Sequence, residues 1–102
     1  MKLAEKIHTD GRKLYSYPFR IYWLDCAGDQ APARIFSVPK KIYKRAVKRN
    51  LIRRRTREAF RHVCGKYPAL EGVHLMLIYT ATEILDYGRI SEDLETALGK
   101  IQ

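Results

Sequence analysis

The chain has 102 residues, of which 46% are hydrophobic, and carries a formal net charge of +9 at pH 7. That length allows one domain, residues 1–102, with a single core. No apolar stretch approaches the roughly 20 residues of a membrane-spanning helix, and the first residues contain no apolar segment typical of a secretory signal. The composition therefore argues against a membrane protein and favours a polyanion as partner.

The first third of the chain predicts a short helix and two strands. Residues 3–10 are compatible with a helix, and the Tyr17-Pro18 step favours extended backbone that leads into a strand over residues 19–24, FRIYWL. Residues 27–30, AGDQ, have the chemistry of a turn, and a second strand is expected over residues 34–38, RIFSV. A further, weaker strand is expected in this part of the chain, but the pattern gives it no position.

The remainder of the chain predicts a helix, a strand and a helix. Residues 44–64 contain no Gly or Pro and form one long predicted helix, while residues 73–80, VHLMLIYT, are a continuous apolar run typical of a buried strand. Ser91 is the expected N-cap of a final helix whose buried stripe contains Leu94, Leu98 and Ile101. The order α-β-β-(β)-α-β-α predicts an α+β fold, a two-layer sandwich of helices on one mixed sheet.

Positive charge is concentrated in one segment. Residues 40–61 contain eleven basic residues and one acid, a net charge of +10, so the other 80 residues sum to −1. Binding to a polyanion relieves the self-repulsion of such a segment, so we expect nucleic acid as the partner. The basic residues are Lys40, Lys41, Lys44, Arg45, Lys48, Arg49, Arg53, Arg54, Arg55, Arg57 and Arg61.

A helical wheel sorts the long helix into two sides. One stripe contains Arg49, Asn50, Arg53, Arg54, Arg57 and Arg61. The opposite, apolar side is expected to pack on the sheet and contains Val47, Leu51, Ile52, Ala59, Phe60 and Val63. Lys48 and Arg55 interrupt that apolar side, and we expect them to extend along the edge of the sheet.

The repulsion within the stripe has a measurable cost. Like charges four residues apart destabilise a helix by about 0.2–0.5 kcal/mol per pair, or about 1–2.5 kcal/mol for this helix. An ordinary solvated helix alternates positive and negative charges. Guanidinium groups also suit bidentate contacts with phosphate, so we interpret the stripe as a phosphate-binding face.

Aromatic residues near basic ones can stack on unpaired bases. The candidates are Tyr15, Tyr17, Phe19, Tyr22 and Phe36. Because side chains alternate along a strand, only one of two sets in residues 19–24 can face the core. We expect Trp23 in the core and Tyr22 on an open face.

No pattern predicts catalytic side chains or a metal site. Carboxylates cluster only at the start of the last helix, where the helix dipole accounts for them: Glu92, Asp93 and Glu95. The remaining candidates are scattered without metal-ligand spacing, and the thiols are expected to stay reduced: His8, His62, His74, Cys26 and Cys64.

Residues 46–61, AVKRNLIRRRTREAFR, resemble the signature of the protein subunit of bacterial ribonuclease P. That family pattern is AV-x-RN-x-x-(K/R)R-x-x-RE-x-(F/Y)R, and every fixed position is met. Arg34 and residues 37–41, SVPKK, resemble the strand and lysine pair that precede the signature. The likeness covers about residues 11–101.

The resemblance implies a left-handed βαβ crossover, which is an exception to the usual hand. It also implies a non-catalytic subunit of an endoribonuclease that removes the 5′ leader from precursor tRNA. The RNA subunit would carry the chemistry with its Mg²⁺. The partners would be the catalytic RNA and precursor tRNA, in the cytoplasm, with no membrane and no small-molecule substrate.

The resemblance also implies roles for individual residues. In the family the signature helix contacts the catalytic RNA, and a cleft between this helix and the sheet holds the single-stranded leader. The RNA-binding residues would be Lys40, Lys41, Lys44, Arg45, Arg49, Asn50, Arg53, Arg54, Arg57 and Arg61. The leader cleft would contain Phe19, Tyr22 and Phe36.

Three features depart from the family pattern. Tyr43 stands where a glycine is common, and His74 stands where an aspartate is often found. Measured against the family pattern, we expect a shorter N-terminus, without the basic arm and most of the first helix.

Two other functions remain open from the sequence. One is a general structured-RNA-binding protein without a processing role, and the other is a protein-only nuclease. Binding to a membrane surface is disfavoured because the apolar side of the long helix is needed for the core.

Overall fold

The computed structural model describes residues 2–26 and 31–101, so the turn predicted at residues 27–30 lies outside the described residues. The elements are α1 (Leu3–Asp10), β1 (Arg12–Ser16), β2 (Phe19–Asp25), β3 (Arg34–Ser37), α2 (Ala46–Val63), β4 (Val73–Tyr79) and α3 (Tyr87–Gly99). Two short 3₁₀ segments, Cys64–Lys66 and Pro68–Gly72, connect α2 to β4. The predicted order of helices and strands is confirmed, and so is the α+β class.

The four strands form one mixed sheet in the order β1-β2-β4-β3. β1 pairs with β2 and β2 with β4 in antiparallel fashion, whereas β3 and β4 are parallel neighbours. A parallel pair needs a crossover connection, and α2 supplies it. The left-handed sense of this crossover stays a prediction.

β1 is the strand that the sequence could not place. It forms a hairpin with β2 in which Ser16 is paired with Phe19, so only Tyr17 and Pro18 remain to reverse the chain. The peptide bond between them is cis. The prediction that Tyr17-Pro18 extends the backbone into a strand is therefore wrong, because these two residues are the turn itself.

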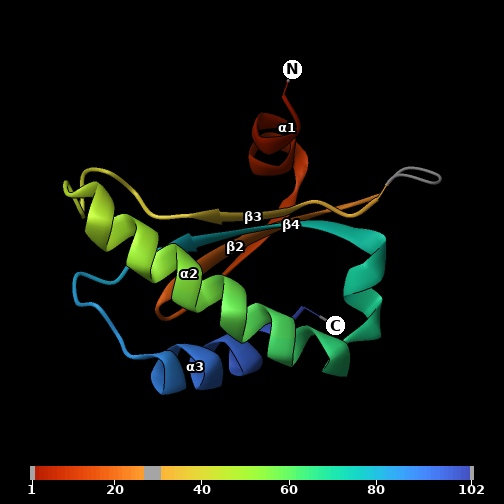
Figure 1. Ribbon diagram of the computed structural model, residues 1–102. Coiled ribbons are helices and arrows are strands. Elements are labelled where there is room, and N and C mark those ends of the chain that lie inside the picture. The colour runs from red at the N-terminus through yellow and green to blue at the C-terminus, as the bar shows by residue number, and fades with distance from the viewer. Residues whose placement is uncertain (1, 27–30, 102) are drawn as a thin grey trace.

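The sheet separates two apolar clusters. Figure 1 shows α2 and α3 on one side of the sheet and α1 on the other. The larger cluster lies on the α2/α3 side and includes Trp23, as predicted, together with Phe19, Ile21, Leu75, Leu77 and Tyr79. On the α1 side, Ile7 packs with Tyr22 and Met76 in a smaller cluster.

α3 begins earlier than expected. Its N-cap is Asp86, whose Oδ1 accepts a hydrogen bond from the backbone N of Arg89 at 2.8 Å. The predicted N-cap, Ser91, is wrong and lies inside the helix. The reason is that the buried stripe starts one turn earlier, at the fully buried Ile90, and continues through Leu94 and Leu98.

The loop between β4 and α3 is hydrogen-bonded to β4 and to the segment that precedes α2. The hydroxyl of Tyr79 donates to the carbonyl of Glu83 at 2.7 Å and accepts from the backbone N of Leu85 at 3.1 Å. The hydroxyl of Tyr43 donates to the carbonyl of Ala81 at 2.8 Å. Burial raises the pKa of Tyr79 to about 12 and also raises that of Tyr43, so both phenols remain protonated donors at neutral pH.

Across the described ranges, no helix combines the length and the apolar character that crossing a bilayer requires.

Candidate nucleic-acid interface

The inner side of α2 anchors it on the sheet. Its buried residues are Ile52, Thr56, Ala59, Phe60 and Val63. Thr56 was not expected there. Its hydroxyl donates to the carbonyl of Ile52 at 2.8 Å, so the buried hydroxyl has a hydrogen-bond partner. Val47 was expected in the core but is 78% exposed, and Leu51 is only half-buried. Val47 lies five residues before Ile52, about 140° around the helix, and therefore faces away from the sheet.

The outer side of α2 carries five guanidinium groups and one carboxamide, a set that we name the arginine ridge: Arg49, Asn50, Arg53, Arg54, Arg57 and Arg61. Arg49 and Arg53 are half-buried, and the other four are exposed. The one acid that reaches the ridge within the described residues is Glu58, 3.5 Å from Arg61, and both side chains are largely exposed. An exposed pair of this kind contributes little, so the ridge keeps its positive charge.

Two ridge residues also organise the surface. Arg49 Nη1 donates to the carbonyls of Tyr43 and Lys44, both at 2.8 Å, which holds the segment that precedes α2. Arg53 Nη2 donates to Asn50 Oδ1 at 2.8 Å. A guanidinium has five N–H donors, so each of these arginines retains donors for phosphate.

The remaining predicted RNA-binding residues lie where the chain turns into α2. We name this set the basic turn: Lys40, Lys41, Lys44 and Arg45, all of them exposed. The turn is closed by backbone N–H groups of Ile42 and Tyr43, which both donate to the carbonyl of Pro39. α2 has no acidic residue in its first turn and no side-chain cap. Its first N–H groups are therefore open to an anion, to which the helix dipole adds attraction.

The sequence suggested that Lys48 and Arg55 extend along the edge of the sheet, and for Arg55 this is wrong. Lys48 is exposed in the first turns of α2. Arg55 is half-buried, and its Nη1 donates to the carbonyl of Leu85 at 2.8 Å. Arg55 therefore belongs to the contacts between α2 and the β4–α3 loop, and its charge is accommodated by a hydrogen bond to the backbone.

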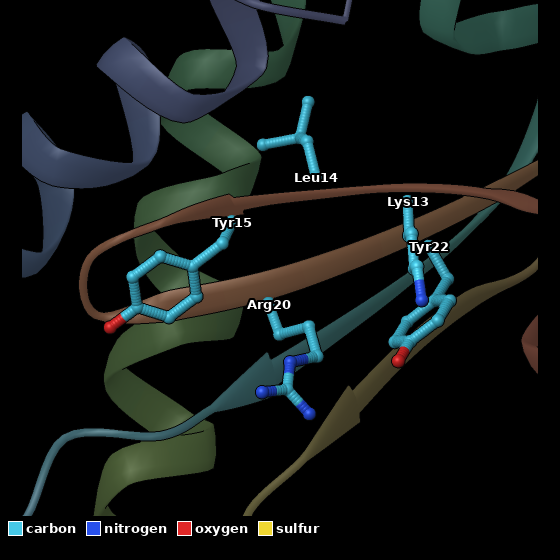
Figure 2. A pocket seen from close by; sticks show the side chains of 5 residues that line it. All are labelled: Lys13, Leu14, Tyr15, Arg20 and Tyr22. Atoms are coloured by element: carbon cyan, nitrogen blue, oxygen red, sulfur yellow. The ribbon is translucent and has the colours of Figure 1, made fainter.

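A second candidate surface lies on the other face of the sheet. We name it the sheet-face site: Lys13, Tyr15, Arg20 and Tyr22. These residues line a hollow of about 430 Å³, and Figure 2 shows them with Leu14, which packs against the α2/α3-side core instead. Lys13 is paired with Tyr22, and Tyr15 with Arg20, across the β1–β2 hairpin. Residues opposite each other in antiparallel strands project to the same face, which brings these four together.

The sheet-face site combines positive charge with aromatic surface. Tyr15 is 57% exposed, whereas Tyr22 is 6% exposed because the ring of His8 from α1 lies 4.7 Å from its own ring, measured between centroids. None of the residues that line the hollow is acidic. A phosphate can contact the cations while a neighbouring unpaired base stacks on a phenol ring.

The three residues expected to line one leader cleft do not lie together. Phe19 is fully buried in the α2/α3-side core, with its ring 5.9 Å from that of Tyr79, so its assignment to a cleft surface is wrong. Phe36 is half-buried on the same side and lies edge-on to Phe60. Tyr22 lies on the opposite face, because side chains alternate along β2. Lys13 and Arg20 were missed, since their meeting depends on the pairing of β1 with β2.

The histidines and cysteines do not gather into a metal site in the part of the chain that the structure describes. No three His, Cys, Asp or Glu side chains are grouped there as metal ligands would be. His62 lies beside Tyr87, and His74 is buried with its Nδ1 accepting from the backbone N of Ala33 at 3.0 Å. Cys26 and Cys64 are both free thiols.

A mixed sheet that holds an uncompensated cationic helix on one face and an aromatic, cationic hollow on the other defines a small α+β RNA-binding protein. A family model described as ribonuclease P matches residues 5–102. The chain therefore belongs to the ribonuclease P protein family. It is the RNA-binding accessory protein component of that tRNA-processing endoribonuclease, and the alternative of a general RNA-binding protein is not favoured.

Solved structures agree on the fold. The ribonuclease P protein of Staphylococcus aureus is similar with a TM-score of 0.80 and 24% identity, covering 100% of this chain and 93% of that one. The ribonuclease P protein of Thermotoga maritima is similar with a TM-score of 0.82 and 22% identity, covering 99% of this chain and 93% of that one. No curated protein sequence matches the chain.

Proposed function

We propose that residues 1–102 act as one RNA-binding domain in which the arginine ridge and the basic turn bind the catalytic RNA of ribonuclease P. The observation that carries this proposal is the row of guanidinium groups on α2, which only Glu58 approaches among the described acids. A helix that tolerates this repulsion is stabilised when phosphates lie against it. Its buried inner side keeps the ridge in place before RNA binds, which lowers the entropic cost of binding.

The sheet-face site is the proposed contact for the single-stranded 5′ leader of precursor tRNA. Its two cations suit a phosphate backbone, and Tyr15 offers an exposed ring to an unpaired base. This changes the assignment made from the sequence, in which the cleft lay between α2 and the sheet. The two surfaces lie on opposite faces of one sheet, so one protein can bind both RNAs at once.

The chemistry of leader removal belongs to the RNA in this proposal, and Mg²⁺ serves the RNA subunit. The protein lowers the repulsion between the phosphates of the two RNAs, which otherwise requires more Mg²⁺. The complex is expected to work in the cytoplasm.

The test is reconstitution with a bacterial ribonuclease P RNA, scoring removal of the 5′ leader from precursor tRNA while Mg²⁺ is lowered. We expect the protein to restore cleavage at Mg²⁺ concentrations where the RNA alone is inactive. Equal affinity for an unrelated structured RNA, with no such restoration, would contradict the proposal. Cleavage by the protein without any added RNA would instead support a protein-only nuclease.

A further inference from the structure

A second hollow lies where α2 meets the edge strand β3. We name it the edge pocket: Arg34, Phe36, Arg57, Phe60, Arg61 and Cys64, which line a space of about 390 Å³. Pockets for small ligands occupy about 300–1,000 Å³, so this one has room for a single ring system. Phe36 and Phe60 pack on the α2/α3 side of the sheet, whereas Tyr22 of the sheet-face site lies on the other side. The two hollows are therefore separate.

Aromatic rings form the walls of the edge pocket. The rings of Phe36 and Phe60 lie 5.7 Å apart, nearly perpendicular to each other. Each ring carries a cation: Arg57 Cζ lies 5.7 Å from the centroid of Phe36, and Arg34 Cζ lies 5.4 Å from that of Phe60. The described residues that line the space include no acid. Such walls accept a flat, electron-rich ring and an anion beside it.

The guanidinium groups around the pocket differ in their freedom. Arg34 is fixed, because it donates to the carbonyls of Leu70 and Val73, both at 2.7 Å. Arg57 is exposed and, among the described residues, makes neither a hydrogen bond nor an ion pair. The Arg61 guanidinium has its 3.5 Å contact with Glu58 as its one ion pair to a described residue. One wall is thus preorganised, while two guanidinium groups at the mouth remain available to a ligand.

We propose that the edge pocket receives one unstacked base of the catalytic RNA, with the phosphate beside that base bound by Arg57 and Arg61. When the base stacks on Phe36, the guanidinium of Arg57 moves from the ring to the phosphate. A free nucleotide offers the same chemistry. RNA is favoured because Arg57 and Arg61 also belong to the arginine ridge, so a strand bound along the ridge passes the mouth of the pocket. This inference rests on the proposed function of the ridge.

The reactivity of the two cysteines measures directly whether RNA occupies the edge pocket. Cys64 lines the edge pocket, whereas Cys26 follows β2 and has its Sγ 3.8 Å from Nδ1 of His74. Both are half-buried free thiols, so Cys26 is a matched internal control. Their alkylation by N-ethylmaleimide can be followed separately by mass spectrometry of peptides. With a bacterial ribonuclease P RNA at ten times its Kd, we expect Cys64 to react about tenfold more slowly and Cys26 to be unchanged.

Substitutions show whether Cys64 is protected because a base enters the pocket or because RNA simply covers it. Phe36→Leu keeps an apolar side chain but removes the ring, and should abolish most of the Cys64 protection while weakening RNA binding about fivefold to tenfold. Arg57→Gln should also reduce protection more than Arg54→Gln, which removes the same charge from the same helix away from the pocket. Circular dichroism checks that each variant is folded.

The inference is overturned if Cys64 reacts as fast in the saturated complex as in the free protein. It is also overturned if the RNA protects Cys64 in the Phe36→Leu variant as well as it does in the unsubstituted protein. In either case the Kd for the RNA still reports on the ridge, so the proposed function is judged separately. Should the RNA not bind at all, the proposed function fails and adenosine 5′-monophosphate tests the pocket alone. It should then slow Cys64 alkylation where ribose 5-phosphate does not, and equal rates with the two compounds contradict the pocket as a base site.

Discussion

The arginine ridge and the sheet-face site offer RNA different kinds of contact. The ridge is built from one helix, with four arginines spaced four residues apart and, among the described acids, one weak contact. The sheet-face site is built from two strands and offers two cations beside two phenol rings. Dense charge acts over long range and depends on salt, while stacking acts only on bases that are unpaired. The difference supports the proposal that structured RNA binds the ridge and a single strand binds the sheet face.

The two surfaces also depend on different supports. The ridge is held by the buried side of α2 and by the β4–α3 loop, to which Arg55 donates. The sheet-face site is held by the pairing of β1 with β2 and is partly covered by α1. A change at one surface should therefore leave the other intact, and the following variants test that independence.

The largest effect is expected from the triple substitution of Arg53, Arg54 and Arg57 by glutamine. The loss of three phosphate contacts should weaken binding to ribonuclease P RNA about a hundredfold near 0.15 M salt and reduce the slope of log Kd against log salt by about 2–3. Filter binding over a range of salt concentrations measures both. The preference for precursor tRNA over mature tRNA, once the complex is saturated, should be unchanged.

A second triple variant controls for net charge. Lys66, Arg89 and Lys100 lie outside the ridge and already contact Glu95, Asp93 and Ser16, respectively. Their substitution by glutamine removes the same charge. It should alter the salt slope by less than one unit, because these side chains lie outside the ridge and already contact other side chains. An equal loss in both triple variants would mean that overall charge, rather than the ridge, binds the RNA.

The next effect concerns the loop that supports the ridge. Burial raises the pKa of Tyr79 from 10.0 to about 12. An acid whose pKa is raised by folding contributes stability that is fully present below pH 10 and is lost as the pH rises towards 12. The loss should reach about 2–3 kcal/mol, at 1.36 kcal/mol per pKa unit.

Chemical denaturation of the free protein between pH 9 and pH 12 measures this loss. Tyr79→Phe lowers stability at all pH values because two hydrogen bonds are removed, but it should make the pH dependence shallower. Tyr43 also titrates at raised pH, so the difference between the two proteins isolates Tyr79. Parallel curves for the two proteins would refute the assignment.

A smaller and more selective effect is expected at the sheet-face site. The double variant Tyr15→Ala and Arg20→Gln should weaken binding of precursor tRNA to the reconstituted enzyme about tenfold, the loss of one stacked base. Binding of mature tRNA, which has no leader, should be unaffected. Tyr87→Ala removes an exposed tyrosine from α3 and is the matched control. Equal losses with and without a leader would break the distinction between the two surfaces.

The sequence predicted the ridge well because every part of it lies in one helix. The spacing of Arg49, Arg53 and Arg57 needs only the helical period, and tertiary structure merely decides which side is buried. The sheet-face site could not be predicted in this way. Lys13 and Arg20 meet only through the β1–β2 pairing, and β1 had no recognisable position because its turn is Tyr17-Pro18 rather than an Asn-Gly or Asp-Gly step.

Phe19 shows a different limit of sequence reasoning. Alternation along β2 separates Phe19 and Trp23 from Tyr22, but the pattern alone does not say that both faces of this strand are covered. The expected core position of Trp23 should have assigned Phe19 to the same side. The covering of Tyr22 by α1 depends on how a short helix packs back onto the sheet, which only the assembled fold determines.

The smallest effect tests where the buried side of α2 begins. Val47 is 78% exposed, whereas Ile52 is fully buried. Val47→Ala should therefore change the free energy of unfolding by less than about 0.5 kcal/mol, and Ile52→Ala should reduce it by about 2–5 kcal/mol. Urea denaturation of both variants measures the contrast. If Val47→Ala cost more than about 1 kcal/mol, the first turn of α2 would be packed against the protein, and fewer of its N–H groups would be open to phosphate.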